Sequence, residues 1–274
     1  MTLRSTLRQL SLWCAVGLGA AATVTALYAR EYSRRLPDFT APELHRALGG
    51  PVRSREADER VLSQVPYESH VTNPFVAVED KRFYEHNGFS WTSFAAAHLR
   101  NLRYAPGELF FERPYAYAGA STIEQQIAKN LRLARGEERS RVVALGTLKY
   151  KLEEILLACK ISADLSKAEI LTVYVNTNNY GANTVGIEAA ARDFFDERID
   201  ELSDKELFAL VKTINSPNNF YPHPHRIAIG AWQDRRARLV RTTDALIQNV
   251  RDDRSRFWSP AEFETMLRQD LRFR

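Results

Sequence analysis

The feature that most constrains the fold of this chain is a series of apolar runs with helical spacing, each opened by a helix-capping signal. In the run from Leu145 to Cys159, apolar side chains recur every three or four residues, which is the period of a helix with one buried face. Two further runs begin with a serine followed three residues later by a glutamate, at Ser166–Glu169 and Ser203–Glu206. This is the pattern of a capping box. Strand patterns are few, so the chain is predicted to be mainly α-helical.

Three more helix starts are predicted. Thr40 precedes a proline and a glutamate, which is typical of the first turn of a helix. Ser90 precedes a run that contains Trp91, and Ser121–Glu124 has the spacing of another capping box. Residues 176–183 are rich in Asn and Gly and are predicted to form a loop.

The segment from Leu10 to Ala29 contains no charged residue. A helix of this length would span about 30 Å, the thickness of a bilayer core. Arginines flank both ends, and the short leading tail favours a cytoplasmic N-terminus. A cleaved signal peptide is the alternative. The apolar run is long for one, however, and its best candidate cleavage site, Leu27-Tyr28-Ala29, has a large residue where a small one is expected. We expect a retained transmembrane anchor.

Basic residues and cysteines limit the function classes. The net charge is +4, and thirty of the 38 basic residues are Arg. The planar guanidinium of Arg matches the geometry of a phosphate group. The excess of Arg therefore fits nucleic acid, lipid phosphate or diphosphate partners, and it does not distinguish among them. Cys14 lies in the apolar segment and Cys159 in a predicted helix, so neither a disulfide nor a metal site is predicted. The pair His223 and His225 lies in a Pro-rich turn and is interpreted as structural.

Two strings carry candidate chemistry. The first, 78–88, places the adjacent acids Glu79 and Asp80 before an aromatic pair and a histidine. The second, 119–130, places Gln125 and Lys129 one turn apart near a helix start, where anionic oxygens are favoured. Alone, the first would be a charged turn and the second a capped surface helix.

Together with three later strings, they resemble the peptidoglycan glycosyltransferase family. This family comprises the lysozyme-like transglycosylase domains of penicillin-binding proteins and their monofunctional relatives. The resemblance covers residues 70 to 240 and rests on five ordered motifs. These are Glu79-Asp80-x-x-Phe83-x-x-His86-x-Gly88, Gly119-x-Ser121-Thr122-Ile123-x-Gln125-Gln126-x-x-Lys129-Asn130, Tyr150-Lys151-Leu152-Glu153-Glu154, Lys167-x-x-Ile170-Leu171-x-x-Tyr174-x-Asn176, and the helix Leu207–Ile214 running into Ser216-Pro217. No Ser-x-x-Lys occurs, so the chain resembles the monofunctional form.

The resemblance implies a lysozyme-like transglycosylase domain with a small membrane-facing lobe around residues 94–118, preceded by one transmembrane helix. The expected layout is a cytoplasmic tail, an anchor, a juxtamembrane segment, the glycosyltransferase domain and a C-terminal helical extension, at residues 1–9, 10–29, 30–70, 71–245 and 246–274. The expected location is the periplasmic face of a bacterial inner membrane.

The resemblance also implies a reaction. The family polymerises a lipid-linked disaccharide, lipid II, into glycan strands, inverting the anomeric centre and releasing lipid diphosphate. Glu79 matches the base and Glu154 the second acid, while Lys129 and Lys151 match contacts to the diphosphate. The other substrate-binding positions expected are Gln125, Ser121, Asn176, Asp80 and Phe83. No cofactor is required, although a divalent cation is compatible with the chemistry. The expected partners are lipid II, the growing glycan strand, the membrane and cell-wall synthesis proteins, and not nucleic acid.

The chain departs from the family pattern in four places. Tyr150 stands where the family has Arg, Glu124 replaces Thr and Ser90 replaces Asp. The spacing from Lys129 to Glu154 is also longer, and Arg139 or Arg141 in the insert is the predicted substitute for the missing Arg. Two alternatives remain open: a glycan- or lipid-binding scaffold without turnover, and a glycan-cleaving enzyme with Glu79 as general acid.

Overall fold

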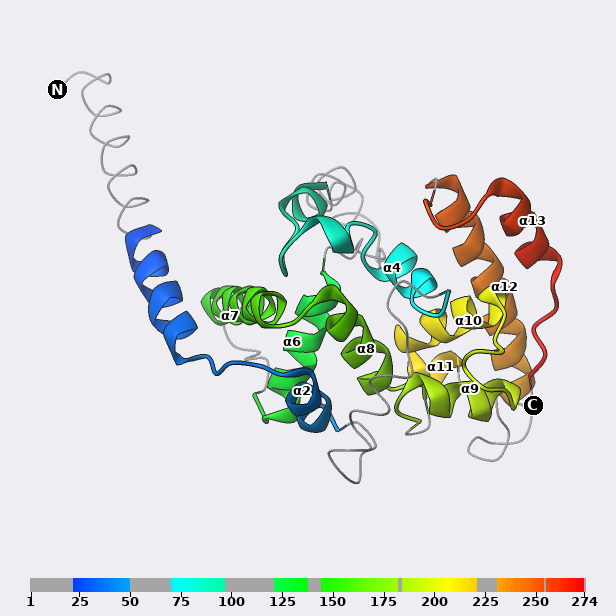
Figure 1. The fold of residues 1–274 in the computed structure, drawn as a ribbon, viewed down its shortest axis with the longest axis horizontal. Coiled ribbons are helices and arrows are strands. Elements are labelled where there is room, and N and C mark those ends of the chain that lie inside the picture. Colours follow the sequence, from blue (N-terminus) through cyan, green and yellow to red (C-terminus); the bar gives the residue numbers. More distant parts are fainter. Residues whose placement is uncertain are drawn as a thin grey trace, which may run out of the picture.

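The computed structural model describes residues 22–49, 70–96, 121–137, 144–181, 184–220, 231–253 and 255–273. These residues form helices joined by turns, with an isolated antiparallel bridge between Asn179 and Val185, which confirms the mainly α-helical class (Figure 1). The labelled helices are α2 (Ala41–Ala47), α4 (Asn73–Glu79), the 3-10 helix η1 (Phe83–Glu85), α6 (Ile123–Ala134), α7 (Ala144–Asp164), α8 (Lys167–Thr177), α9 (Ile187–Phe195), α10 (Asp204–Ile214), α11 (Pro217–Phe220), α12 (Ala231–Asp252) and α13 (Pro260–Arg268). Residues 22–35 and 91–96 are also helical.

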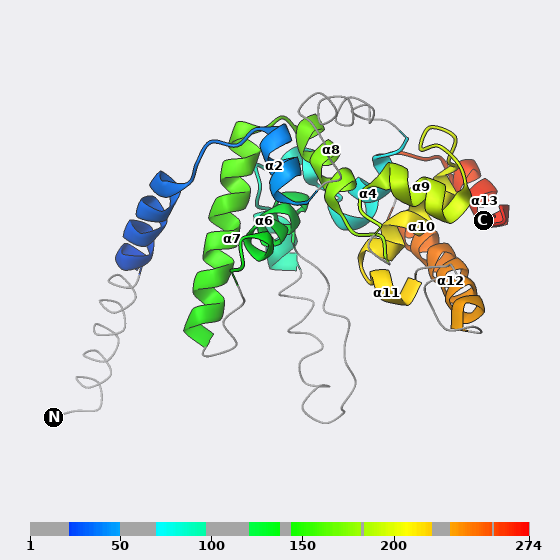
Figure 2. The ribbon, with the colours of Figure 1, turned by 90° about the horizontal axis from the view of Figure 1, so that it is seen from below.

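The helices form two neighbouring groups. Helices α2, α6, α7 and α8 pack together on one side, and α10 packs against α4, α9, α12 and α13 on the other. Figure 2 shows the helix at residues 22–35 and the long helix α7 beside it on one side of the molecule, α12 and α13 on the other, and α4 between α7 and α12. The two groups meet through α8 and α9, which contact each other.

Helix α4 is held by two apolar clusters. Phe75 and Val76 are fully buried in the main cluster, whereas Ala77 belongs to the second cluster, with Phe208. Val78 packs against both clusters. Burial of large apolar side chains is the dominant stabilising term in folding, so α4 is fixed on two faces. Its last residue is therefore presented at a defined place between the two groups of helices.

Gly88 brings three parts of the chain together. Its φ of +86° favours glycine, and a Cβ added there would lie 2.5 Å from the carbonyl oxygen of Ala158 on α7. The hydroxyl of Thr122 donates to the carbonyl oxygen of Gly88 at 2.8 Å. The glycine of the first motif thus allows the second motif and α7 to approach it closely.

Most of the predicted helix starts are confirmed. Ser166 and Ser203 form complete capping boxes with Glu169 and Glu206, as predicted. Thr40 is the N-cap residue of α2, and the Ser90 hydroxyl accepts a hydrogen bond from the backbone N–H of Ser93.

The predicted loop at 176–183 begins later than expected. Helix α8 continues through Thr177, because Asn176 is buried and its side-chain amide donates to the carbonyl oxygen of Thr172 at 2.9 Å. An Asn whose amide is satisfied within the helix no longer competes with the helical backbone.

Several predictions fall on parts of the chain outside the described residues. These include the anchor up to residue 21, the lobe from residue 97 to 118, Cys14, and the pair His223 and His225. Among the described helices none has the length and apolar character needed to cross a bilayer. The domain layout stays a prediction, and α12 continues through its boundary at residue 245.

Candidate active site

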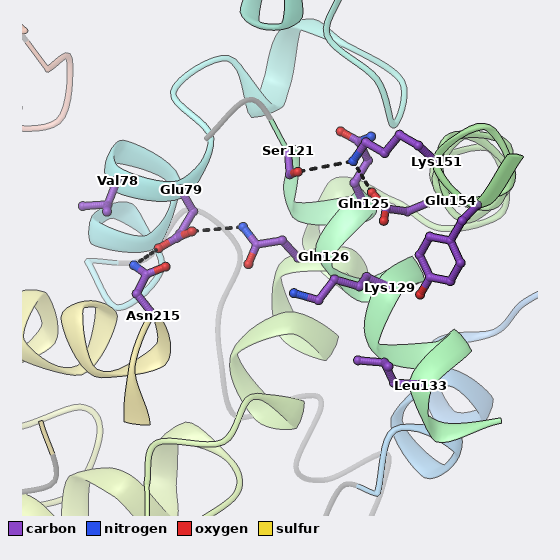
Figure 3. A pocket seen from close by; sticks show the side chains of 11 residues that line it. Val78, Glu79, Ser121, Gln125, Gln126, Lys129, Leu133, Lys151, Glu154 and Asn215 are labelled. Atoms are coloured by element: carbon purple, nitrogen blue, oxygen red, sulfur yellow. Dashed lines mark hydrogen bonds and ion pairs between the residues drawn. The ribbon is translucent and has the colours of Figure 1, made fainter. Parts of the chain in front are cut away.

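A cleft of about 510 Å³ is lined by residues from both groups of helices (Figure 3). Its lining comes from the end of α4, one face of α6, the middle of α7 and the residue after α10. The lining residues are Val78, Glu79, Ser121, Gln125, Gln126, Lys129, Leu133, Tyr150, Lys151, Glu154 and Asn215. Both predicted catalytic acids and both predicted lysines are therefore in one cleft, together with Ser121 and Gln125.

Glu79 is held by two neutral amides. Its Oε2 accepts a hydrogen bond from Nε2 of Gln126 at 2.9 Å, and its Oε1 accepts one from Nδ2 of Asn215 at 2.8 Å. The Tyr174 hydroxyl donates to Oε1 of Gln126 at 2.9 Å, which fixes the orientation of that amide. Burial, and then the charge of Glu79, raise the pKa of Tyr174 well above 10, so the phenol keeps the proton that it donates.

The lysines lie across the cleft from Glu79. Lys151 donates to Oε1 of Glu154 and to the hydroxyl of Ser121, the latter at 3.4 Å. Lys129 points into the space between Glu79 and Glu154 (Figure 3), and no other described residue is its hydrogen-bond or ion-pair partner. The cleft therefore has the Glu79 carboxylate on one side, the Lys151–Glu154 pair on the other and the Lys129 ammonium between them, which suits a substrate whose reacting hydroxyl is close to a polyanionic group.

Three predicted substrate-binding residues are not brought to the cleft. Phe83 is fully buried in the main cluster, and Asn176 is buried within α8. Asp80 is also buried, and its Oδ2 accepts from the ring of His86 at 2.9 Å and from the backbone N–H of Ile123 at 3.2 Å. Asp80 thus joins the first motif to the start of α6, while its neighbour Glu79 faces the cleft.

The capping box predicted at Ser121 and Glu124 is wrong by one position. The N-cap residue is Thr122, and Gln125 completes the box. Glu124 is fully buried, where its Oε1 accepts from Nζ of Lys167 at 2.6 Å. Burial raises the pKa of the Glu124 carboxyl, and the Lys167 ammonium opposes this rise. Glu124 therefore does not line the cleft, and its departure from the family pattern adds no carboxylate there.

The arginine beside Tyr150 comes from α6. The Arg132 guanidinium lies 3.8 Å from the centroid of the Tyr150 ring, donates to the Tyr150 carbonyl oxygen at 2.8 Å and pairs with Glu153 at 2.7 Å. Arg132 is buried and does not line the cleft. Arg139 and Arg141, the predicted substitutes, lie outside the described residues.

Replacing Tyr150 by arginine is expected to lower the free energy of unfolding by about 1–2 kcal/mol, because the cation–π contact is lost and a second guanidinium is placed beside Arg132. Urea unfolding measures the change. Tyr150→Phe keeps an aromatic ring beside the Arg132 guanidinium and is expected to lose less stability than Tyr150→Arg. A Tyr150→Phe variant as unstable as Tyr150→Arg would contradict this account.

One group of side chains among the described residues has ligand atoms close enough to hold a metal ion, within 4.8 Å of each other: Asp80, His86 and Glu124. It lies outside the cleft lining. The Lys167 ammonium already supplies a cation to Glu124, and His86 is hydrogen-bonded to Asp80. The donor set therefore fits a buried ion-pair cluster better than a metal site.

Two residues that hold Glu79, Gln126 and Asn215, are not among the predicted site residues. Gln126 has a signal that was available, because it lies three residues before Lys129 and so on the same helix face. Asn215 has no such signal, since it is 136 residues from Glu79 and follows the end of α10.

The matches to known proteins cover this cleft. The transglycosylase family model matches residues 48–244. A biosynthetic peptidoglycan transglycosylase of Chromobacterium violaceum is 33% identical over 187 residues, which are 67% of this chain and 72% of that protein.

Longer proteins match over the same region. Penicillin-binding protein 1A of Aquifex aeolicus is 39% identical over 168 residues, 60% of this chain and 20% of that protein. Penicillin-binding protein 1A of Mycolicibacterium smegmatis is 34% identical over 161 residues, 59% of this chain and 18% of that protein. The chain thus spans about a fifth of the length of these penicillin-binding proteins. Since the family match extends over every element that contributes to the cleft, the chain belongs to the transglycosylase family.

Proposed function

We propose that this protein is a peptidoglycan glycosyltransferase that polymerises lipid II into glycan strands, with inversion and release of lipid diphosphate. The observation that carries the proposal is the placement of Glu79 opposite Lys129 and Lys151 in one cleft. Membership of the transglycosylase family supports the same reaction class.

The charged groups in the cleft share the tasks of this reaction. Glu79 takes the proton of the acceptor 4-hydroxyl as its oxygen forms a bond to the anomeric carbon of the donor. The bond from that carbon to the diphosphate breaks, and the electron pair leaves with the diphosphate. Lys129 and Lys151 stabilise the charge that develops there, which is usually the largest contribution to catalysis. Attack from the face opposite the leaving group inverts the anomeric centre.

Glu154 acts on the leaving-group side in this scheme. Its carboxylate is almost fully buried and accepts a hydrogen bond from Lys151. A long lysine side chain loses considerable rotamer freedom when it is fixed, so the carboxylate prepares Lys151 for the diphosphate before substrate binds. Ser121 holds the same ammonium from the start of α6.

The proposal places the protein at the bacterial inner membrane, with a single anchor at residues 10–29 and the cleft on the periplasmic face. Residues 22–29 of that segment belong to the helix at 22–35. Trp91 is 76% exposed and its ring centroid lies 4.8 Å from that of Phe89. Exposed aromatic rings suit the interface of a bilayer, where lipid II and the growing strand are anchored.

A scaffold without turnover is the second candidate, and Tyr150 in the cleft lining, where the family resemblance expects a permanent cation, is the observation that favours it. Purified protein mixed with lipid II in detergent tests both, with glycan strands resolved on gels and released lipid diphosphate quantified. Strand formation establishes the glycosyltransferase, whereas binding without product establishes the scaffold. Soluble fragments released from cell-wall sacculi would instead favour glycan cleavage.

A further inference from the structure

We propose that Asn215 is a positioning residue for the base of this reaction, holding the Glu79 carboxylate in its ionised form and in the orientation that receives the substrate proton. This inference rests on the proposed function and adds to it the residue that follows α10. It starts from the hydrogen bond of 2.8 Å from Nδ2 of Asn215 to Oε1 of Glu79.

The position of Glu79 creates a need for donors. Glu79 is the last residue of α4, where the unpaired carbonyl groups of a helix end carry partial negative charge. A carboxylate is disfavoured there, and N–H donors aimed at it offset that effect. Each carboxylate oxygen has two acceptor sites, so one amide on each oxygen still leaves a site for the substrate hydroxyl.

The two amides differ in how they are held. The side-chain amide of Gln126 is fixed by the hydrogen bond that its Oε1 accepts from the Tyr174 hydroxyl. Asn215 is exposed at the residue after α10, and its contact with Glu79 is the one hydrogen bond that the described residues give its side chain. Both amides line the cleft beside Glu79. Asn215 can therefore be replaced with little effect on packing, which makes its influence on Glu79 measurable.

The other ionisable groups on the elements around the cleft are unchanged by the substitutions at Asn215. Asp80 is turned toward His86, Tyr174 stands behind Gln126, Lys212 of α10 lies over the Phe220 ring, and on the α12 side Asp253 pairs with Lys81. The remaining groups line the cleft itself: Lys129, Tyr150, Lys151 and Glu154.

The test measures protonation of Glu79 directly. In the full-length protein, a pH titration by infrared spectroscopy identifies the Glu79 carboxylate band as the one absent from Glu79→Gln. Asn215→Asp replaces a donor by a second acid, so the two carboxyl groups share a proton, and the midpoint of the Glu79 band is expected to rise by about one pH unit. Asn215→Ala removes the donor alone and is expected to give a smaller rise. In polymerisation, the acidic limb of the kcat/KM profile should move in the same direction.

Asn219→Asp is the matched control, since Asn219 is also exposed and its amide donates to Ser216 rather than to the cleft. It is expected to leave both the band and the profile in place. A Glu79 midpoint that is the same in the wild type and in Asn215→Asp would overturn the inference, even if the rate falls. Because the band is read without substrate, the result stands whether or not the protein polymerises lipid II.

Discussion

Glu79→Gln is expected to lower the rate of glycan polymerisation by about 10³-fold, within the range that a positioned general base contributes. The glutamine has nearly the same shape but cannot take the hydroxyl proton. It also places an amide nitrogen where Gln126 and Asn215 now donate to carboxylate oxygens. The measurement is the initial rate of lipid diphosphate release at saturating lipid II.

The control for this substitution is Glu85→Gln. Glu85 is an exposed glutamate that pairs with Arg82 and lies outside the cleft lining. The same change of charge at this position is expected to leave the rate within twofold of the wild type, and both variants should bind lipid II. If Glu79→Gln keeps more than a tenth of the wild-type rate, Glu79 is not the base and another group in the cleft must take the proton.

Features that depend on neighbours along the chain could be predicted from the sequence. The capping boxes at Ser166 and Ser203 involve residues three positions apart, and the period of the α7 run directly gives a helix. The ordered motifs brought Glu79, Lys129 and Glu154 into one hypothesis, and the structure places all three in one cleft.

Features decided by distant partners could not be predicted. Glu124 has the right spacing to form a capping box with Ser121. Its carboxylate instead accepts a hydrogen bond from the ammonium of Lys167, 43 residues away. Arg132 is an ordinary helix residue in the sequence, yet it reaches Tyr150 across the contact between α6 and α7. In both cases the local pattern allows several partners, and tertiary packing selects one.

The buried pair of Glu124 and Lys167 leads to the largest expected change in stability. Glu124 is fully buried, and Lys167 is the cation that meets it, 4.2 Å from the Phe83 ring centroid. Lys167→Met keeps an apolar stem over that ring but leaves the carboxylate without its partner. The free energy of unfolding at neutral pH is expected to fall by about 3–5 kcal/mol, measured by urea unfolding.

The pH dependence distinguishes a buried charge from lost packing. Burial already raises the pKa of Glu124 above its usual 4.5, and removing Lys167 raises it further, so the folded variant holds this proton more tightly than the unfolded chain. Its stability is therefore greatest below the unfolded pKa and falls as the pH rises through the folded one. The gap between wild type and Lys167→Met should be small at low pH and widen toward neutrality. Adding Glu124→Gln removes the charge and should close most of the gap at neutral pH, whereas a gap that stays the same at every pH would mean that Lys167 acts through packing alone.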